Sequence, residues 1–406
     1  MTDTIKRITG REILNAKGNP TVEAQVETAS GYVAVASVPS GTSTGSYEAK
    51  ALFDGGKRYG GKGCLQAASH VSNEINEALA GKSLESQSAL DQVMIELDGT
   101  QDKSRLGANA ILAASVAIAK ARALSLHKQT YETLTEAKSY KIPDVIATMV
   151  AGGVFGVSGL EFEDYLYIFH GFEKFSDQLE AIVTLRKQLE KNLIKTYGSF
   201  PEDGGALAPP LKSTGEAFEV MLETARQCGY EDHVTLGIDA AISEQYDKKT
   251  GLYAVKQGMD RAQLCAYYVE LAKKYPLTYL EDCFDEDDIE GFRMLKEALP
   301  SVQNVGDDLF TSNIKRLEAY HEAANGLLLK VNQIGTVSEA ILAAQYAQTH
   351  GMDVTVSLRS GETTDDFIAD LSVALSTKQI KLGSPVRAER NVKYNRLQYI
   401  ATVLGV

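Results

Sequence analysis

The chain has 406 residues, of which 44% are hydrophobic and 23% are charged, which is the composition of an ordinary globular protein. Its formal net charge of −13 argues against nucleic acid or an anionic membrane as the main partner, because both would repel an acidic protein. The longest apolar run is too short to span a bilayer, the N-terminal segment lacks a signal-peptide core, and the cysteines are scattered, so we expect a cytoplasmic protein with reduced thiols.

The first part of the chain predicts a small α+β domain. Residues 21–29 and 32–39 alternate apolar and polar side chains around a turn-forming Ser-Gly pair, which predicts paired strands. Helical periodicity follows over residues 64–80, 86–97 and 109–126. We therefore expect three strands followed by helices, in a domain that covers residues 1–130.

The remainder, residues 131–406, predicts repeated β–α units. Short apolar runs are mostly separated by one helical pattern each, and they cover residues 234–240, 276–282, 302–308, 326–333, 353–360 and 379–385. Such a series predicts a parallel sheet with helices outside it, most simply a closed β/α barrel. An open, doubly wound sheet is the alternative.

Three carboxylates stand at or just beyond the ends of successive apolar runs: Asp239, Glu281 and Asp307. In a parallel barrel the carboxyl ends of the strands share one rim, so these acids converge in space. Three converging anions repel one another unless a cation joins them, and ligation by oxygen alone suits Mg²⁺. Each acid could instead cap the helix that follows its strand. Their recurrence in consecutive units favours the metal site.

Two lysines, Lys330 and Lys381, end later apolar runs. A lysine at a strand end is usually an exposed residue whose stem covers apolar surface. On the rim that carries the acids, the two would instead supply a base and an anchor for an anion. A neighbouring cation favours the neutral amine that a base requires.

Two loops carry groups that suit a ligand. SLRSGET contains Arg359 and Ser360, whose guanidinium and hydroxyl suit a phosphate or a carboxylate, although the segment could be a simple loop. PSGTSTGSYEAK is rich in Gly, Ser and Thr, which predicts either a plain hairpin loop or a mobile lid. As a lid, it would bring the hydroxyl of Ser43 or Thr44 to a ligand or a metal.

Together these features resemble the enolase (phosphopyruvate hydratase) family over nearly the whole length of the chain. The matching segments are REILNAKGNPTVEAQV, PSGTSTGSYEA, RYGGKG, GANAILAAS, GGALAP, LEDCFDEDD, VGDDLFTSN, LLLKVNQIGT and RSGET. The resemblance implies a small N-terminal α+β domain packed on a β/α barrel whose first units are irregular, in the order ββαα. It also implies a lysine base and one or two Mg²⁺ ions that stabilise an ene-diolate.

The resemblance also assigns the metal ligands. By position, Asp239, Glu281 and Asp307 match the ligands of the higher-affinity magnesium. Ser43 matches the residue that helps to hold a second magnesium once the substrate is bound. The expected cofactor is therefore Mg²⁺, with one ion that shapes the site and another that arrives with the substrate.

The substrate-facing residues follow from the same match. Lys330 matches the base that removes the proton α to the carboxylate, and Lys381 lies on the carboxylate side. Arg359 and Ser360 match the phosphate contacts. The expected partner is a small phosphorylated or phosphonate carboxylate.

Several positions depart from the family pattern, all on the side of the leaving group. Phe155 and Leu358 stand where the family has histidines. The Gln-Glu pair of the family appears as Glu163 and Asp164, and its usual general acid appears as Asp203. We expect Asp203 and Asp164 to be catalytic and Glu163 to bind substrate.

A further departure concerns assembly. Tyr399 stands where the family has an arginine that pairs with a glutamate of the other subunit, although that glutamate persists as Glu23. A homodimer or a higher homo-oligomer is still the expected state.

The expected function is an enolase-like, magnesium-dependent lyase of glycolysis, which eliminates water from 2-phosphoglycerate to give phosphoenolpyruvate. One alternative keeps the ene-diolate chemistry on a different phosphorylated or phosphonate substrate, as in enzymes resembling carboxyphosphonoenolpyruvate synthase. The other is a catalytically weak, enolase-like binding protein. Intact metal ligands and both lysines argue against that last alternative.

Overall fold

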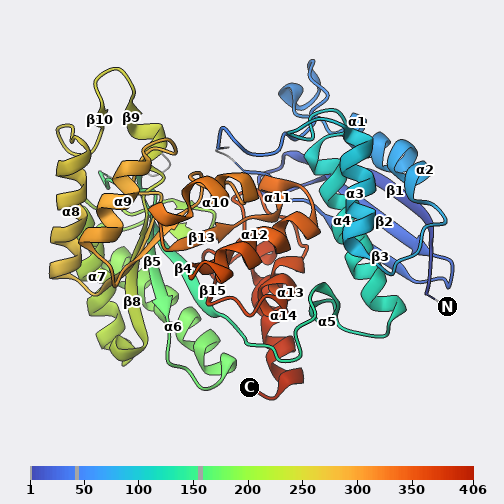
Figure 1. Ribbon diagram of the computed structural model, residues 1–406. Helices are drawn as coiled ribbons and strands as arrows, with labels where there is room; N and C mark the ends of the chain where they lie inside the picture. The colour runs from blue at the N-terminus through green and yellow to red at the C-terminus, as the bar shows by residue number, and fades with distance from the viewer. Residues whose placement is uncertain (1, 42–44, 154–158) are drawn as a thin grey trace.

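A computed structural model describes residues 2–41, 45–153 and 159–406. The predicted ligand Ser43 and Phe155, where the resemblance implies a histidine, lie outside these described residues. The described chain forms a small N-terminal domain and a larger barrel, which pack side by side (Figure 1). The predicted fold class, a β/α barrel with a small N-terminal α+β domain, is therefore confirmed.

The N-terminal domain consists of an antiparallel sheet with helices packed on it. Its strands occur in the order β1-β2-β3, and the alternation predicted for the second and third of them is observed. The elements are β1 (Ile5–Leu14), β2 (Pro20–Thr28), β3 (Val33–Ser37), η1 (Arg58–Gly61), α1 (Leu65–His70), the π-helical η2 (Val71–Ile75), α2 (Asn76–Leu79), α3 (Gln87–Asp98) and α4 (Ala108–Ser125).

Helix α4 is the core helix of this domain. By length and composition it is the one helix in the described residues that could cross a membrane, but 78% of it is buried inside the protein. It packs against β2 and β3 on one side and contacts two helices of the barrel domain, α11 (Val331–Ile334) and α12 (Val337–Thr349), on the other. Its uniformly apolar sequence is therefore explained by burial between two domains.

Eight described strands close into a barrel, because the last of them pairs with the first. In barrel order they are β4 (Asp144–Ala151), β5 (Asp164–Phe169), β8 (Val234–Asp239), β11 (Leu277–Glu281), β12 (Gln303–Gly306), β13 (Gly326–Leu329), β14 (Asp353–Ser357) and β15 (Gln379–Lys381). All neighbouring pairs are parallel except those of β5, which is antiparallel to both β4 and β8. The fully parallel sheet predicted from periodicity is therefore wrong at β5, and the ββαα start is confirmed.

Helices cover the outside of the barrel, mostly one between successive strands (Figure 1). They are α6 (Phe175–Tyr197), α7 (Thr214–Cys228), α8 (Arg261–Lys274), α9 (Ile289–Ala298), α10 (Ile314–Tyr320), α13 (Phe367–Ala374) and α14 (Ala388–Leu404), together with α11 and α12. Short elements complete the domain: β6 (Glu202–Asp203), β7 (Ala206–Leu207), η4 (Glu231–His233), η5 (Ile242–Gln245), β9 (Tyr246–Asp247), β10 (Leu252–Tyr253) and η6 (His321–Ala323).

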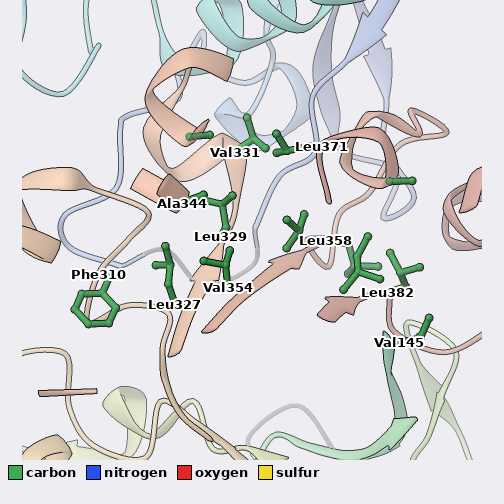
Figure 2. Close-up of a cluster of buried hydrophobic side chains, with 14 of the residues drawn as sticks. Val145, Phe310, Leu327, Leu329, Val331, Ala344, Val354, Leu358, Leu371 and Leu382 are labelled. Carbon is green, nitrogen blue, oxygen red and sulfur yellow. The ribbon is translucent and has the colours of Figure 1, made fainter. Parts of the chain in front are cut away.

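The barrel has an inner and an outer hydrophobic layer. Strand side chains alternate in direction, so one set fills the inside and the other faces the helices. A separate cluster drawn only from strand residues forms the inner layer: Ile146, Leu166, Ile168, Tyr279, Val305 and Leu328. Figure 2 shows part of the outer layer, where strand residues such as Leu327 and Leu329 meet helix residues such as Ala344.

The segment that joins the domains contains a short helix, α5 (Tyr131–Leu134), which contacts both α4 and α13. The division after residue 130 stays a prediction.

Candidate active site

Three predicted ligands lie on one rim of the barrel because their strands are neighbours. Asp239 ends β8, Glu281 ends the adjacent β11, and these two residues are paired in the strand register. Asp307 follows directly after β12, the next strand. The predicted convergence at the carboxyl ends of the strands is therefore observed.

Lys381, at the end of β15, neutralises two of these acids. Its Nζ lies 2.5 Å from an oxygen of Asp239 and 2.9 Å from both oxygens of Glu281. Burial and the neighbouring Asp239 raise the pKa of Glu281. Burial also acts to raise the pKa of Asp239, but the charge of Lys381 together with hydrogen bonds to Glu281 and Lys381 leaves that pKa below its usual value. The same two carboxylates hold the pKa of Lys381 well above its usual value despite burial. This lysine is therefore a fixed positive charge.

Lys330 follows β13 and is paired with the third acid. Its Nζ donates a hydrogen bond to Asp307, whose other oxygen accepts one from Gln333 at 2.7 Å. Its backbone N–H donates to the hydroxyl of Ser312 at 2.8 Å, which fixes the residue where the strand ends. Burial lowers the pKa of Lys330, but the charges of the neighbouring carboxylates, Asp307 first and then Glu281, raise it, and the net direction is upward.

A second grouping of acids shares Asp307. The carboxylate of Asp282 accepts hydrogen bonds from the backbone N–H groups of Asp307 and Asp308, at 2.7 and 2.9 Å. Asp282, Asp307 and Asp308 each offer an oxygen within 4.8 Å of the others. Burial raises the pKa of Asp282 well above its usual value and that of Asp308 to about 7. The rim therefore offers two overlapping sets of oxygen ligands.

The loop after β14 is held by the N-terminal domain. Arg359 is buried, and its Nη1 lies 3.1 Å from both carboxylate oxygens of Glu48. Its backbone N–H donates to Glu362 at 2.9 Å, and Glu362 in turn is held by Lys393 at 2.7 Å. An ion pair between the two domains therefore holds the guanidinium at the site.

Other acids come from the irregular start of the barrel. Asp164 begins β5 and accepts a hydrogen bond from Thr148 of β4 at 3.2 Å. Burial raises the pKa of Asp164 to about 6, against the opposing charge of Lys381. Burial likewise raises the pKa of Glu163, helped by the negative charge of Asp239. Asp203 belongs to β6 and is exposed.

One cavity of about 110 Å³ joins these groups. Among the described residues its lining contains no histidine and contains the following predicted site residues: Glu163, Asp164, Asp203, Asp239, Asp307, Lys330, Arg359, Ser360 and Lys381. Glu281 is fully buried and does not line the cavity. Leu358 lines it as well, at 9% exposure. Figure 2 places this leucine within the outer hydrophobic layer, together with Leu371 and Leu382.

Sequence reasoning missed several residues of this site. Lys17 and Arg390 line the cavity, Thr148 holds Asp164, Glu48 holds Arg359, and Gln333 holds Asp307. Thr148 and Arg390 come from segments without a recognisable motif, so a single sequence offers little signal for them. Glu48 and Gln333 do lie in segments that were singled out, GSYEAK and KVNQIG, and could have been found there.

Nearly the whole chain is similar to known proteins of one family. A family model described as "Enolase, N-terminal domain" matches residues 5–134, and one described as "Enolase, C-terminal TIM barrel domain" matches residues 139–406. The chain is 44% identical to the enolase of Methanocaldococcus jannaschii over an alignment that covers 99% of this chain and 96% of that protein. It is 43% identical to the enolase of Methanococcus vannielii with the same coverage. It is 44% identical to the enolase of Pyrococcus furiosus, over 96% of this chain and 93% of that one.

Proposed function

Because the chain belongs to the enolase family, we propose that the cavity at the carboxyl ends of the barrel strands is its active site. The protein is a hydro-lyase of the phosphopyruvate hydratase class, which interconverts 2-phosphoglycerate and phosphoenolpyruvate. One observation carries the assignment of the site: a lysine, Lys330, and a carboxylic acid, Asp203, line the same small cavity. Elimination of water requires such a base and such an acid.

The reaction divides into proton abstraction and loss of the hydroxyl. The neutral amine of Lys330 takes the proton from C2 of 2-phosphoglycerate, and the electron pair moves into the carboxylate to give an ene-diolate. That pair then forms the C2=C3 double bond while the C3–O bond breaks. Asp203 gives its proton to the departing oxygen, which leaves as water. Asp164, held by Thr148, would keep that oxygen in place.

The chemistry of the donor set fits magnesium. Asp239, Glu281 and Asp307 offer oxygens from three neighbouring strand ends, and carboxylate oxygens are the ligands that Mg²⁺ prefers. When bound, the ion would supply positive charge for the ene-diolate and would favour the neutral form of Lys330. Ser43 would contribute to a second ion.

The remaining residues orient the substrate. Lys381 provides the fixed positive charge for the substrate carboxylate, and Arg359 with Ser360 would hold the phosphate. A bidentate guanidinium suits a phosphate group, and the ion pair with Glu48 holds Arg359 in the lining of the cavity. Glu163, whose pKa is raised by burial, would donate a hydrogen bond to the substrate.

We infer that the protein is a divergent member of the enolase family, in which carboxylic acids assist the departing hydroxyl without help from a histidine. Leu358 supports this inference, because its apolar side chain cannot donate a proton. The leaving-group half would then depend on Asp203 and Asp164. We further propose a glycolytic role in the cytoplasm and a homodimer, although within the chain Glu23 is already paired with Arg11.

The assignment is tested by incubating the protein with Mg²⁺ and 2-phosphoglycerate. Formation of phosphoenolpyruvate is followed by its ultraviolet absorbance, and deuterium incorporation at C2 is measured in the same samples. We expect the wild-type protein to form phosphoenolpyruvate and to incorporate deuterium at C2. The variant Asp203→Asn should form no product but should still exchange the C2 proton. Full-length similarity to enolases does not favour the alternative substrates or the binding protein. Exchange without product in wild type would sink the assignment of Asp203 and Asp164.

A further inference from the structure

Two buried arginines reach the turn that carries Asp203, and they use their donors differently. Arg186 of α6 is 1% exposed, and all three of its side-chain nitrogens donate hydrogen bonds to protein acceptors. These acceptors are the carbonyl of Gly205, the hydroxyl of Ser384 and the carboxylates of Glu190 and Glu202. Arg186 therefore ties the β6–β7 turn to the loop after β15.

Arg390, in the first turn of α14, reaches the same two loops. Its Nη2 lies 2.5 Å from the point where a Cβ on Gly204 would stand, and its Nη1 lies 1.9 Å from the corresponding point at Gly383. Any side chain at either glycine would overlap the guanidinium. Gly204 directly follows Asp203 in the chain, and both glycines line the active-site cavity together with Arg390.

The guanidinium of Arg390 is held by fewer hydrogen bonds and ion pairs among the described residues than the guanidinium of Arg186. Arg390 is 7% exposed, and within the parts of the chain that the structure describes its Nε is buried without a hydrogen-bond acceptor. The ion pairs of the described residues do not include it, whereas Arg186 forms two. A buried cation that forms no ion pair among the described residues is costly, so its retention beside a cavity points to a charge that arrives with the ligand.

The location indicates which charge that is. Arg390 lies against the residue after Asp203, and its charge acts on Asp164, where with Lys381 it opposes the effect of burial. Both acids belong to the leaving-group half of the proposed site. The phosphate contacts Arg359 and Ser360 follow a different strand, β14.

We propose that Arg390 is a further catalytic residue, which contacts the C3 oxygen and stabilises the negative charge that forms as the hydroxyl leaves. The proposal rests on the proposed function of Asp203. As the C3–O bond breaks, its electron pair goes to the oxygen, which takes the proton of Asp203 and leaves as water. Arg390 donates hydrogen bonds to that oxygen and offsets the charge left on the carboxylate.

The test compares two leaving groups. Chloride departs as an anion without a proton, whereas the hydroxyl needs a proton to depart as water. Arg390→Met is assayed with 2-phosphoglycerate and with the analogue that carries chloride in place of the C3 hydroxyl. We expect kcat for 2-phosphoglycerate to fall on the order of 10²–10³-fold, the loss typical of one transition-state donor. The loss for the chloride analogue should stay below about tenfold, and exchange at C2 should change little, since neither needs help with hydroxide.

Two further variants keep the result interpretable. Arg390→Lys retains the charge and should recover part of the loss, with a melting temperature close to that of wild type. Arg186→Met removes hydrogen bonds within the protein and should lower the melting temperature and slow both substrates alike.

Equal losses of Arg390→Met on both leaving groups would make Arg390 a structural residue, and a change in KM alone would make it a binding residue. Either result overturns the proposal. Wild-type protein that does not dehydrate 2-phosphoglycerate would overturn the proposed function instead.

Discussion

At the scale of single residues, the proposed proton abstraction depends on Lys330. Its Nζ contacts Asp307, and its backbone is fixed by Ser312, so the amine has a defined direction. Lys330→Ala removes the base but none of the proposed carboxylate ligands. We expect exchange of the C2 proton with D₂O to fall on the order of 10²–10⁴-fold, while Mg²⁺ still raises the melting temperature. Mass spectrometry of the substrate measures the exchange. A variant that exchanges at the wild-type rate would show that another base is at work.

Leu358 allows the two proposed halves of the reaction, proton abstraction and loss of the hydroxyl, to be tested separately. Restoring imidazoles as Phe155→His with Leu358→His should raise the dehydration rate more than the exchange rate, because only dehydration needs a proton donor. Leu358 is buried in the outer hydrophobic layer, so the added polar ring should cost about 1–3 kcal/mol of stability. Deuterium incorporation and product absorbance are measured on the same samples.

The control for this experiment is Phe155→Asn with Leu358→Asn, which adds polarity without an imidazole. An equal gain in the control would assign the effect to hydration of the cavity. Equal gains in exchange and dehydration would show that the histidine positions do not belong to the leaving-group half.

At the scale of elements, the strands that the sequence predicted best are those whose apolar run stops at a charged residue. The runs before Asp239, Glu281 and Lys381 all become strands that end at those residues. The direction of β5 could not be predicted, because a strand buried on both faces carries no periodicity that distinguishes parallel from antiparallel pairing. The apolar run 326–333 predicts one strand, but β13 ends at Leu329 and α11 begins at Val331.

The same strand ends raise the question of which acids hold magnesium. If the ligands are those of β8, β11 and β12, then Asp239→Asn and Asp307→Ala should remove most of the Mg²⁺-dependent rise in melting temperature, and Asp308→Asn should keep it. Binding to the native state stabilises by about 2.7 kcal/mol at a hundredfold excess over Kd, which is large enough to measure by calorimetry. If Asp308→Asn removes the rise and Asp239→Asn keeps it, the grouping of Asp282, Asp307 and Asp308 is the metal site.

At the scale of the whole molecule, the site depends on contacts between the domains that the sequence could not reveal. Glu48 and Arg359 are 311 positions apart, and nothing in either segment indicates that they pair. The same holds for Lys120 with Asp365 and for Lys103 with Glu339, which join α4 and its neighbouring loop to the barrel. Candidate ligands could be found because their positions follow from the barrel, whereas partners brought by a second domain follow only from how the two domains dock.

Asp91 provides a test of that docking. Its carboxylate is fully buried in α3 and accepts hydrogen bonds from Ser115 of α4 at 2.6 Å and from the backbone N–H of Ser338 in α12 at 3.0 Å. Burial raises the pKa of Asp91 above its ordinary value of 3.8, although these hydrogen bonds oppose the rise. The folded protein therefore keeps this proton to a higher pH than the unfolded chain does. The stability that the group contributes is full below pH 3.8 and is lost as the pH rises through the folded-state pKa.

Asp91→Asn cannot ionise, so the melting temperature of wild type minus that of the variant should fall as the pH rises from about 4 through the folded-state pKa of Asp91. Ser115→Ala removes one donor and keeps the carboxylate, which raises the pKa of Asp91 further and should make the total decline larger and extend it to a higher pH than in wild type. Differential scanning calorimetry at several pH values gives all three curves. A difference between wild type and Asp91→Asn that grows toward neutral pH would mean that the hydrogen bonds outweigh burial. In that case the domains would be joined by an ionised Asp91, and acid rather than neutral pH would loosen them.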